Sequence, residues 1–187
     1  MNKIVSLEQL LPARQAWLAA GRTLVFTNGV FDLLHIGHVR YLQEARSLGD
    51  VLIVGLNSDS SVRALKGPGR PLVPQTERAE LLAALACVDH VTLFEAITAR
   101  QLVDALRPEI YVKGGDYAQR PDTIQPARRE ITRLEQLSKP LPEAEVVLAY
   151  GGRVLVVPYL RGYSTTELIE RIQRQGGDPG QSLPVRG

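Results

Sequence analysis

The stretch His35-Ile36-Gly37-His38 is the most informative part of the sequence, together with the strand-like run Thr23-Leu24-Val25-Phe26-Thr27 that precedes it. A strand brings the backbone to the edge of a sheet, and a glycine permits close approach of a ligand. The two imidazoles then project from the first turn of a helix, whose free N–H groups already favour anions. This arrangement predicts a site that binds the phosphates of a nucleotide.

Strand-like and helix-like segments alternate along the rest of the chain. Ser6 and Gln9 have the spacing of a capping box at the start of a helix that Gly21 can end, and Pro12 predicts two short helices or a kink. Residues 51–56 are apolar on both faces, as in a central parallel strand. The alternation predicts a single α/β domain with a doubly wound, Rossmann-like parallel sheet.

The other predicted strands cover residues 88–94, 110–112 and 154–157. The predicted helices cover residues 37–48, where Gly49 ends the helix, a short stretch from 58 or 59, residues 75–86, residues 98 to before Pro108, and residues 167–174. Residues 117–150 interrupt this order with polar, proline-rich sequence around one predicted amphipathic helix over 126–138. The predicted organisation is an N-terminal helical segment over 1–22, a main domain over 23–175 with an insertion at about 117–150, and a disordered tail over 176–187.

Composition narrows the function classes. The formal net charge is +2, from 22 basic and 20 acidic residues that are interspersed along the chain, so neither a nucleic-acid nor a membrane partner is predicted. The single cysteine, Cys87, excludes an intrachain disulfide and fits a reducing compartment. The sequence has no signal-peptide pattern and no apolar run long enough to span a bilayer, which predicts a cytoplasmic protein.

Polar residues follow the predicted strands, at the edge where an open α/β sheet binds its ligands. These candidates are Thr27, Asn28, Gly29, Asn57, Ser58, Asp59, Lys66, Arg70, Lys113, Gly114, Gly115, Asp116, Ser164, Thr165 and Thr166. Transfer of a nucleotidyl group needs mainly positioning and neutralisation of phosphate charge, which imidazole donors and loop cations supply without a protein nucleophile.

The segment Gly29-Val30-Phe31-Asp32-Leu33-Leu34-His35-Ile36-Gly37-His38 resembles the signature of the cytidylyltransferase-like nucleotidyltransferase superfamily. Three further blocks make the chain similar to the D-glycero-D-manno-heptose 1-phosphate adenylyltransferase domain: Leu-Lys-Gly-Pro-Gly-Arg-Pro at 65–71, Val-Lys-Gly-Gly-Asp-Tyr at 112–117 and Ser-Thr-Thr at 164–166. The resemblance covers about residues 5–116 and 151–173. That domain occurs alone or fused to a sugar kinase, and we expect the stand-alone form here.

The resemblance implies that ATP and a heptose 1-phosphate give an ADP-heptose and pyrophosphate, with Mg²⁺ bound to the triphosphate and no separate metal site. Implied catalytic residues are His35, His38 and Lys66. Implied nucleotide-binding residues are Thr27, Asn28, Gly29, Gly37, Lys113, Gly115, Asp116, Ser164, Thr165 and Thr166. Implied substrate-binding residues are Asp32, Asn57, Arg70 and Arg78, with capping of backbone N–H groups as an equal alternative for Asp32.

Several alternatives stay open at this point. One alternative is a related enzyme that uses CTP and glycerol 3-phosphate or another small phosphate ester, because such an enzyme has the same motif. A second alternative is a regulatory module that binds a nucleotide without catalysing a reaction. A zinc site formed by His35, His38, Cys87 and His90 is weaker, because the last two residues flank a helix end and a buried strand. Homodimers are common among such enzymes. The long segment 117–150 could form a lid or a dimer contact, and its presence leaves the identity of the sugar undecided.

Overall fold

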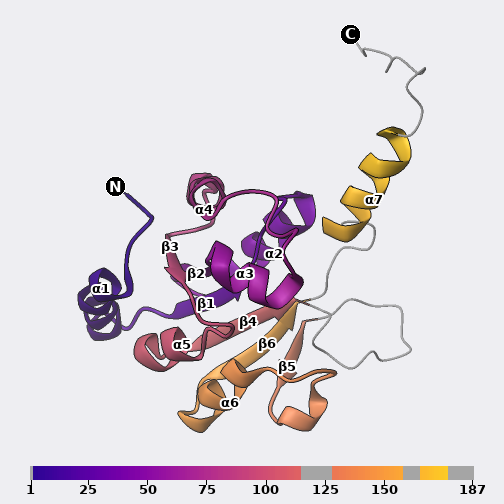
Figure 1. Ribbon diagram of the computed structural model, residues 1–187. Helices are drawn as coiled ribbons and strands as arrows, with labels where there is room; N and C mark the ends of the chain where they lie inside the picture. The colour runs from indigo at the N-terminus through magenta and orange to yellow at the C-terminus, as the bar shows by residue number, and fades with distance from the viewer. Residues whose placement is uncertain (1, 115–127, 158–164, 177–187) are drawn as a thin grey trace.

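The computed structural model describes residues 2–114, 128–157 and 165–176, and its centre is a six-stranded sheet in the order β3-β2-β1-β4-β6-β5 (Figure 1). Five strands are parallel: β1 (Leu24–Gly29), β2 (Val51–Asn57), β3 (His90–Phe94), β4 (Ile110–Gly114) and β6 (Arg153–Val157). The sixth, β5 (Arg129–Ile131), pairs antiparallel with β6 at the outer edge. The doubly wound α/β prediction is therefore confirmed, with one antiparallel strand added.

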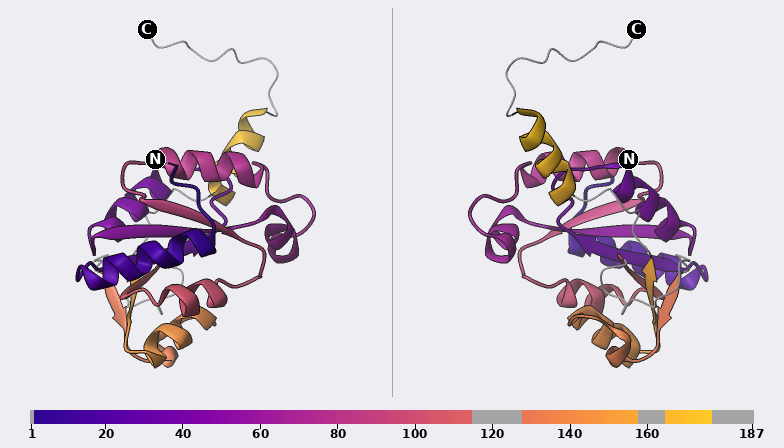
Figure 2. Two further views of the ribbon diagram at one scale, coloured as in Figure 1. Left: turned by 90° about the vertical axis from the view of Figure 1, so that its left-hand side faces the viewer. Right: turned by 90° about the vertical axis from the view of Figure 1, so that its right-hand side faces the viewer.

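Helices cover both faces of the sheet, as the side views show (Figure 2). On one face lie α1 (Leu7–Ala19), α5 (Arg100–Leu106) and α6 (Pro142–Ala149), and on the other lie α2 (Ile36–Arg46) and α4 (Gln75–Ala84). The remaining helices are α3 (Asp59–Lys66), η2 (Leu134–Gln136) and α7 (Thr165–Gly176). None of the helices in the described ranges is long and apolar enough to cross a membrane.

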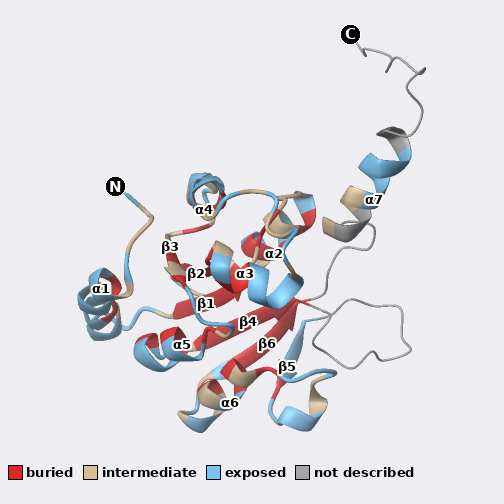
Figure 3. Ribbon diagram, in the orientation of Figure 1, coloured by how far each residue is buried: buried red, intermediate tan, exposed pale blue. Residues whose placement is uncertain are grey.

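Alternate residues of each strand enter the two cores, because successive side chains point to opposite faces. Leu24 and Phe26 pack with α1, α5 and α6, whereas Val25 between them packs with α2 and α4. The central strands β2 and β4 are buried along their whole length, and β1 is buried up to its last residue, Gly29 (Figure 3). This two-sided burial explains why the run over 51–56 has apolar residues on both faces.

The capping box of α1 is confirmed, and of the two alternatives at Pro12 the pair of short helices is wrong. Ser6 Oγ accepts a hydrogen bond from the Gln9 amide, and the Gln9 side chain accepts one from the Ser6 amide. A single helix runs through Pro12 to Ala19. Proline removes only one backbone donor there, and the buried residues Leu10 and Arg14 hold the helix against the protein on either side of it.

The amphipathic helix predicted over 126–138 is also wrong, because the described part of that range forms β5 and η2. Ile131 is buried in the core, and Glu130 forms a salt bridge with Arg153 on the neighbouring strand. Such pairing between distant segments leaves no signal in local periodicity. Helix α6, which follows within the same long segment, was not predicted.

Helix α2 ends earlier than expected, at Arg46, with Ser47 rather than Gly49 as its C-cap. The need for glycine at position 49 comes instead from close packing. A Cβ atom there would lie 2.8 Å from the Thr23 carbonyl oxygen and 2.7 Å from a methyl group of Val25. The glycine thus lets the turn before β2 approach the start of β1.

Candidate active site

The two histidines of the motif meet at the start of α2, after the carboxyl end of β1. His35 is the N-cap residue, His38 lies in the first turn, and their rings stack with centroids 3.8 Å apart. The Phe31 ring lies 5.1 Å from the His38 ring. Phe31 has a φ of +47°, which a bulky residue rarely adopts, and a Cβ atom at Gly29 would come within 3.0 Å of its ring. The glycine therefore makes room for the aromatic support of His38.

Burial, together with the nearby positive charges of His35 and Lys66, lowers the pKa of the His38 imidazole to about 4, against a backbone hydrogen bond at Leu33 that raises it. His38 is therefore neutral at pH 7. Its Nδ1 atom is buried and has no hydrogen-bond partner among the residues that the structure describes. A buried ring nitrogen beside a helix N-terminus and a lysine is suited to an anionic ligand, whose charge would raise the imidazole pKa.

Hydrogen bonds between β1, α2 and β4 fix the residues at the end of β1. Thr27 Oγ1 and the Tyr41 hydroxyl lie 2.7 Å apart, and that hydroxyl donates to the Val112 carbonyl. Asn28 Oδ1 accepts from the Tyr111 hydroxyl at 2.6 Å. Thr27 is fully buried, so its side chain holds α2 against the sheet.

Lys113 lies beside Asn28 at the end of β4. Its Nζ atom donates to the Asn28 backbone carbonyl at 2.8 Å and to Asn28 Oδ1 at 3.0 Å. The lysine is almost fully buried, with 8% of its surface exposed. The structure therefore brings the predicted residues Asn28 and Lys113 into direct contact, one strand apart, at the ligand-binding edge of the sheet.

Asp32 is a buried acceptor for the loop over residues 67–74, which joins α3 to α4. Its Oδ1 accepts from the amides of Leu72 (2.7 Å) and Val73 (2.9 Å), and its Oδ2 forms a 2.7 Å salt bridge with Arg70. Burial raises the pKa of this carboxyl, but the hydrogen bonds from Val73, Arg70 and Leu72 outweigh it and lower the pKa overall. The backbone amides that Asp32 binds belong to this loop, not to α2.

Arg78, on α4, has no exposed side-chain surface. Its guanidinium donates to the carbonyl oxygens of Val73, Val30 and Asn57 and to the Asp59 carboxylate. It thereby joins the ends of β1 and β2 to the 67–74 loop.

The side chain of Asn57 is buried and donates to Ser61 Oγ. Ser58 is the N-cap of α3, and its hydroxyl accepts a hydrogen bond from the Ser61 amide. Both polar groups at the end of β2 are therefore engaged with α3.

The other predicted site residues are placed only in part. Lys66 is exposed at the end of α3, followed by Gly67 with a φ of +94°, and Gly37 is buried in the first turn of α2. Thr165 begins α7, and Thr166 belongs to the same helix. Gly115, Asp116 and Ser164 lie outside the described residues, as does the tail beyond residue 176.

The four residues of the zinc alternative do not meet. Cys87 and His90 lie at the amino end of β3, where the His90 ring packs 5.4 Å from the Trp17 ring, whereas His35 and His38 follow the carboxyl end of β1. The parallel alignment of β1, β2 and β3 puts these positions at opposite edges of the sheet. Within the described ranges, no three His, Cys, Asp or Glu side chains are grouped so that they could hold a metal ion.

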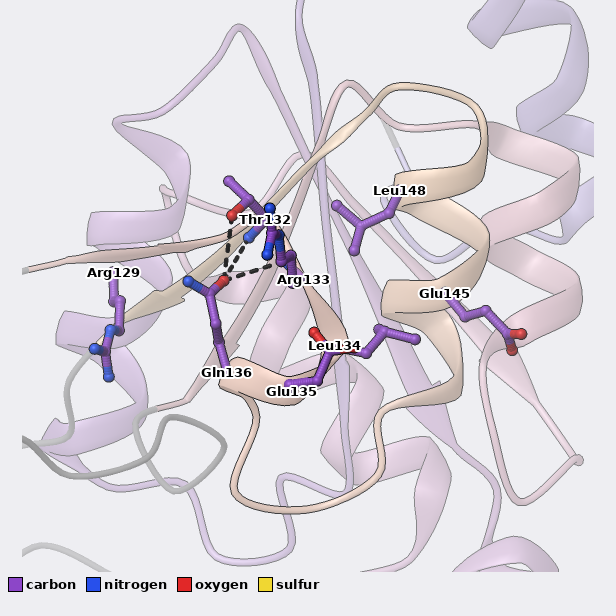
Figure 4. Close-up of a pocket in the computed structure, with 8 residues that line it drawn as sticks. All are labelled: Arg129, Thr132, Arg133, Leu134, Glu135, Gln136, Glu145 and Leu148. Atoms are coloured by element: carbon purple, nitrogen blue, oxygen red, sulfur yellow. Dashed lines mark hydrogen bonds between the residues drawn. The ribbon is translucent and has the colours of Figure 1, made fainter.

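A separate hollow of about 870 Å³ lies beside β5, η2 and α6, away from the histidines (Figure 4). Its walls include Arg129, Arg133, Glu135 and Glu145 as well as the apolar side chains of Leu134 and Leu148. It contains none of the predicted site residues. The candidate active site is therefore the cluster around the two histidines and not this hollow.

Sequence reasoning missed the aromatic residues that support the site. Tyr41 and Tyr111 lie at buried positions of a helix and a strand, where an aromatic side chain reads as ordinary core. Phe31 stands inside the recognised motif, but its left-handed backbone has no signature in residue type. Only their hydroxyl and ring contacts in the folded protein connect them with Thr27, Asn28 and His38.

Known proteins resemble this chain over most of its length. Two relatives are the bifunctional proteins HldE of Syntrophotalea carbinolica and Trichlorobacter lovleyi, which are 49% and 50% identical to it over 171 residues. The matched residues are 91% of this chain and 31% of each relative, so the chain spans about a third of the length of these relatives.

Solved structures show the same architecture. A lipopolysaccharide core biosynthesis protein of Thermoplasma volcanium has 29% identity and a TM-score of 0.52, covering 77% of this chain and all of its own. A pantoate–β-alanine ligase of Francisella tularensis, at 14% identity and a TM-score of 0.54, covers this whole chain and 82% of its own, and is similar in fold alone. The pattern of the family described as cytidylyltransferase-like matches residues 26–171. This protein therefore belongs to the cytidylyltransferase-like family of nucleotidyltransferases.

Proposed function

We propose that this protein transfers AMP from ATP to a heptose 1-phosphate, forming an ADP-heptose and releasing pyrophosphate. The observation that carries the proposal is the stacked pair His35 and His38 at the N-terminus of α2, with Lys66 close enough for its charge to lower the His38 pKa. The identity of about half with the HldE proteins supports it. The blocks at 65–71 and 112–117, which resemble those of heptose 1-phosphate adenylyltransferases, support the choice of ATP and of the sugar.

In the proposed reaction, an anionic oxygen of the acceptor phosphate attacks the α-phosphorus of ATP. A P–O bond forms there while the bond between the α-phosphorus and the bridging oxygen breaks, and pyrophosphate leaves with that electron pair. The attacking oxygen carries no proton, so no general base is needed. The two imidazoles and the amides at the start of α2 stabilise the charge on the phosphate oxygens in the transition state. Neutral His38 donates through one ring N–H.

Magnesium enters this proposal as part of the substrate, as MgATP. Proteins commonly bind Mg²⁺ through substrate phosphates and one or two carboxylates, with water completing the octahedron, rather than in an all-protein cage. The buried carboxylate nearest the histidines in sequence, Asp32, is already bonded to Arg70 and to two loop amides. The protein cations and helix amides then act on the metal-bound triphosphate.

The remaining site assignments form part of the same proposal. Lys66 acts on the triphosphate, and the edge formed by Asn28, Gly29 and Lys113 lines the nucleotide. Nucleotide contacts by Gly115, Asp116, Ser164, Thr165 and Thr166 stay predictions from the sequence, as do a homodimer and a cytoplasmic location.

The test is pyrophosphate release from ATP and from CTP, each with a panel of sugar and polyol phosphates that includes both anomers of heptose 1-phosphate. We expect release with ATP and one heptose anomer, and none from a His38→Ala variant of unchanged fold. Release with CTP and glycerol 3-phosphate would keep the mechanism and overturn the substrates. Tight ATP binding with no release from any pair would favour the regulatory module.

A further inference from the structure

We infer that Asp32 and Arg78 are positioning residues that hold the 67–74 loop, and with it Lys66, relative to the histidines, and that neither contacts substrate. The inference rests on the proposed function for the role of Lys66. It replaces the substrate-binding roles that the family resemblance implies for these two residues.

The first step is that the loop is held at one residue, Val73, from two sides. The Val73 amide donates to Asp32 Oδ1 at 2.9 Å, and the Val73 carbonyl oxygen accepts from Arg78 Nε at 2.9 Å. Asp32 follows β1 and Arg78 lies on α4, so the two contacts come from different elements. Together they fix the end of the loop that precedes α4.

The second step is that both side chains are occupied and enclosed. Asp32 is only 5% exposed, and both of its carboxylate oxygens accept hydrogen bonds, one from Arg70 and the other from the loop amides. The Arg78 side chain has no exposed surface, and each of its three nitrogen atoms donates to a protein oxygen. A ligand would have to break these bonds to reach either group, at the full cost of leaving a buried charge unpaired.

The third step is that the other end of the loop is held by backbone bonds alone: the Gly67 amide donates to the Arg63 carbonyl oxygen at 2.9 Å, and the Arg70 amide donates to the Gly67 carbonyl oxygen at 3.2 Å. Nothing lies within 4 Å of the position that a Cβ atom would take at Gly67 or Gly69. Lys66, just before them, is exposed. The loop is thus anchored over residues 70–73, and the bond from Arg70 to Gly67 connects this anchor to the residue that follows Lys66 at the end of α3.

The anchor is tied directly to the catalytic motif. Arg78 also donates to the Val30 carbonyl, two residues before Asp32, and Asp32 precedes His35 by three residues. Any displacement of this segment of the motif therefore moves the loop as well. Because transition-state stabilisation is sensitive to the placement of the donor, the loop anchor should affect turnover more than ground-state binding of ATP.

The experiment is a double-mutant cycle between Asp32→Asn and Lys66→Ala, with kcat and KM for ATP measured for each variant. We expect Asp32→Asn to lower kcat by about tenfold or more with a smaller change in KM. We expect Lys66→Ala to cost much less in the Asp32→Asn background than in the unmodified protein, since the loop then no longer places the lysine. Additive effects of the two substitutions would overturn the inference.

A second readout does not depend on activity. Hydrogen exchange of the Leu72 and Val73 amides, followed by NMR without ligand, should accelerate in Asp32→Asn; unchanged exchange would overturn the anchor. If the unmodified protein releases no pyrophosphate with any substrate pair, the proposed function fails while this measurement still decides on the anchor. Should Asp32→Asn fail to fold, Arg70→Gln removes only the partly exposed partner of the salt bridge and should show the same effects more weakly.

Asp50→Asn is the matched control. Asp50 Oδ2 accepts from the Thr23 amide at 2.8 Å, a carboxylate–amide bond of the same kind at the other edge of the sheet. It should leave kcat, the Lys66→Ala effect and the exchange of Leu72 and Val73 unchanged. An equal loss of kcat in this control would show that the Asp32 effect is general destabilisation and would overturn the inference.

Discussion

The two edges of the sheet contain similar polar groups, but the hydrogen bonds of these groups serve different purposes. At the amino edge, three carboxylates accept from amides at the starts of strands: Asp50 from Thr23, Glu109 from Leu24 and Asp89 from Leu52. At the carboxyl edge, similar bonds from Asp32 and Arg78 build a frame, and inside it His38 Nδ1 is buried without a hydrogen-bond partner among the described residues. The amino edge also has buried nitrogen atoms without a hydrogen-bond partner among the described residues, His90 Nδ1 and Arg14 Nη1, but only at the carboxyl edge does such an atom lie in the first turn of a helix that follows a strand end.

His38→Ala should give the largest effect and acts on the carboxyl edge alone. Removal of a transition-state donor lowers kcat by about 10²- to 10³-fold, while we expect the protein to stay folded, because the substitution removes a buried ring nitrogen, Nδ1, that has no hydrogen-bond partner among the described residues. Steady-state kinetics measure the change in kcat, and a thermal melt measures the change in Tm. A drop in Tm with little change in kcat would mean that His38 stabilises the fold and has no catalytic role, as for the residues of the amino edge.

Glu109→Gln should give the opposite result at the amino edge. The Glu109 carboxylate binds both the Leu24 amide and the buried Arg14, whose Nη2 atom is 2.6 Å away. Gln keeps one acceptor but presents an amide group to the guanidinium, so we expect the free energy of unfolding to fall by about 2 kcal/mol with kcat intact. Urea unfolding checks this. Loss of kcat at full stability would contradict it.

The pH dependence of stability sharpens the comparison through His38. The unfolded imidazole binds a proton near pH 6.5 and the folded one only near pH 4. The unfolded state therefore binds more protons in between, and stability is full above about pH 6.5 and is lost as the pH falls towards 4. We expect a loss of about 1–2 kcal/mol between pH 7.5 and 5.

His90, at the amino edge, also has a pKa lowered by burial and contributes in the same direction. The histidines are separated by repeating the urea titrations at both pH values with His38→Asn, which should remove the His38 part of the slope. An unchanged slope in that variant would assign the whole effect to other groups.

Gly29→Ala should give the smallest effect. The added methyl group would lie 3.0 Å from the Phe31 ring, which packs beside His38, and a ring can move by the few tenths of an ångström required. We expect a few-fold decrease in kcat and little change in Tm. The matched variant Gly49→Ala meets the Thr23 carbonyl oxygen at 2.8 Å and should lower Tm with kcat unchanged. The reverse pattern would contradict the assignment of function to one edge.

Local signals predicted the parts of the fold that depend on neighbouring residues. The capping box at Ser6, the two-sided apolar run of β2 and the position of the histidine pair at a helix start are all confirmed. The errors arose where contacts with distant segments of the chain determine the local structure. Pro12 is held in a helix by tertiary packing, and β5 exists because it pairs with β6 and buries Ile131.

The same division runs through the site. Residue types and spacing placed His35, His38 and the strand ends at the carboxyl edge of the sheet, because a helix that follows a parallel strand begins at that edge. That this edge binds the ligand stays a prediction. Residue types did not separate Lys66, which is exposed, from Arg78, which is enclosed by four protein oxygens. Both are basic residues near the motif, and only their contacts differ.

The sequence by itself determined the α/β class, the family signature and the edge of the sheet that carries the histidines, since these follow from periodicity and from chemistry within a few residues. The tertiary structure alone decided the antiparallel strand β5, the left-handed backbone of Phe31 and the enclosure of Asp32 and Arg78 around Val73. These depend on contacts between residues far apart in the chain. The energy of such contacts comes from burial and from hydrogen-bond partners that no single segment contains.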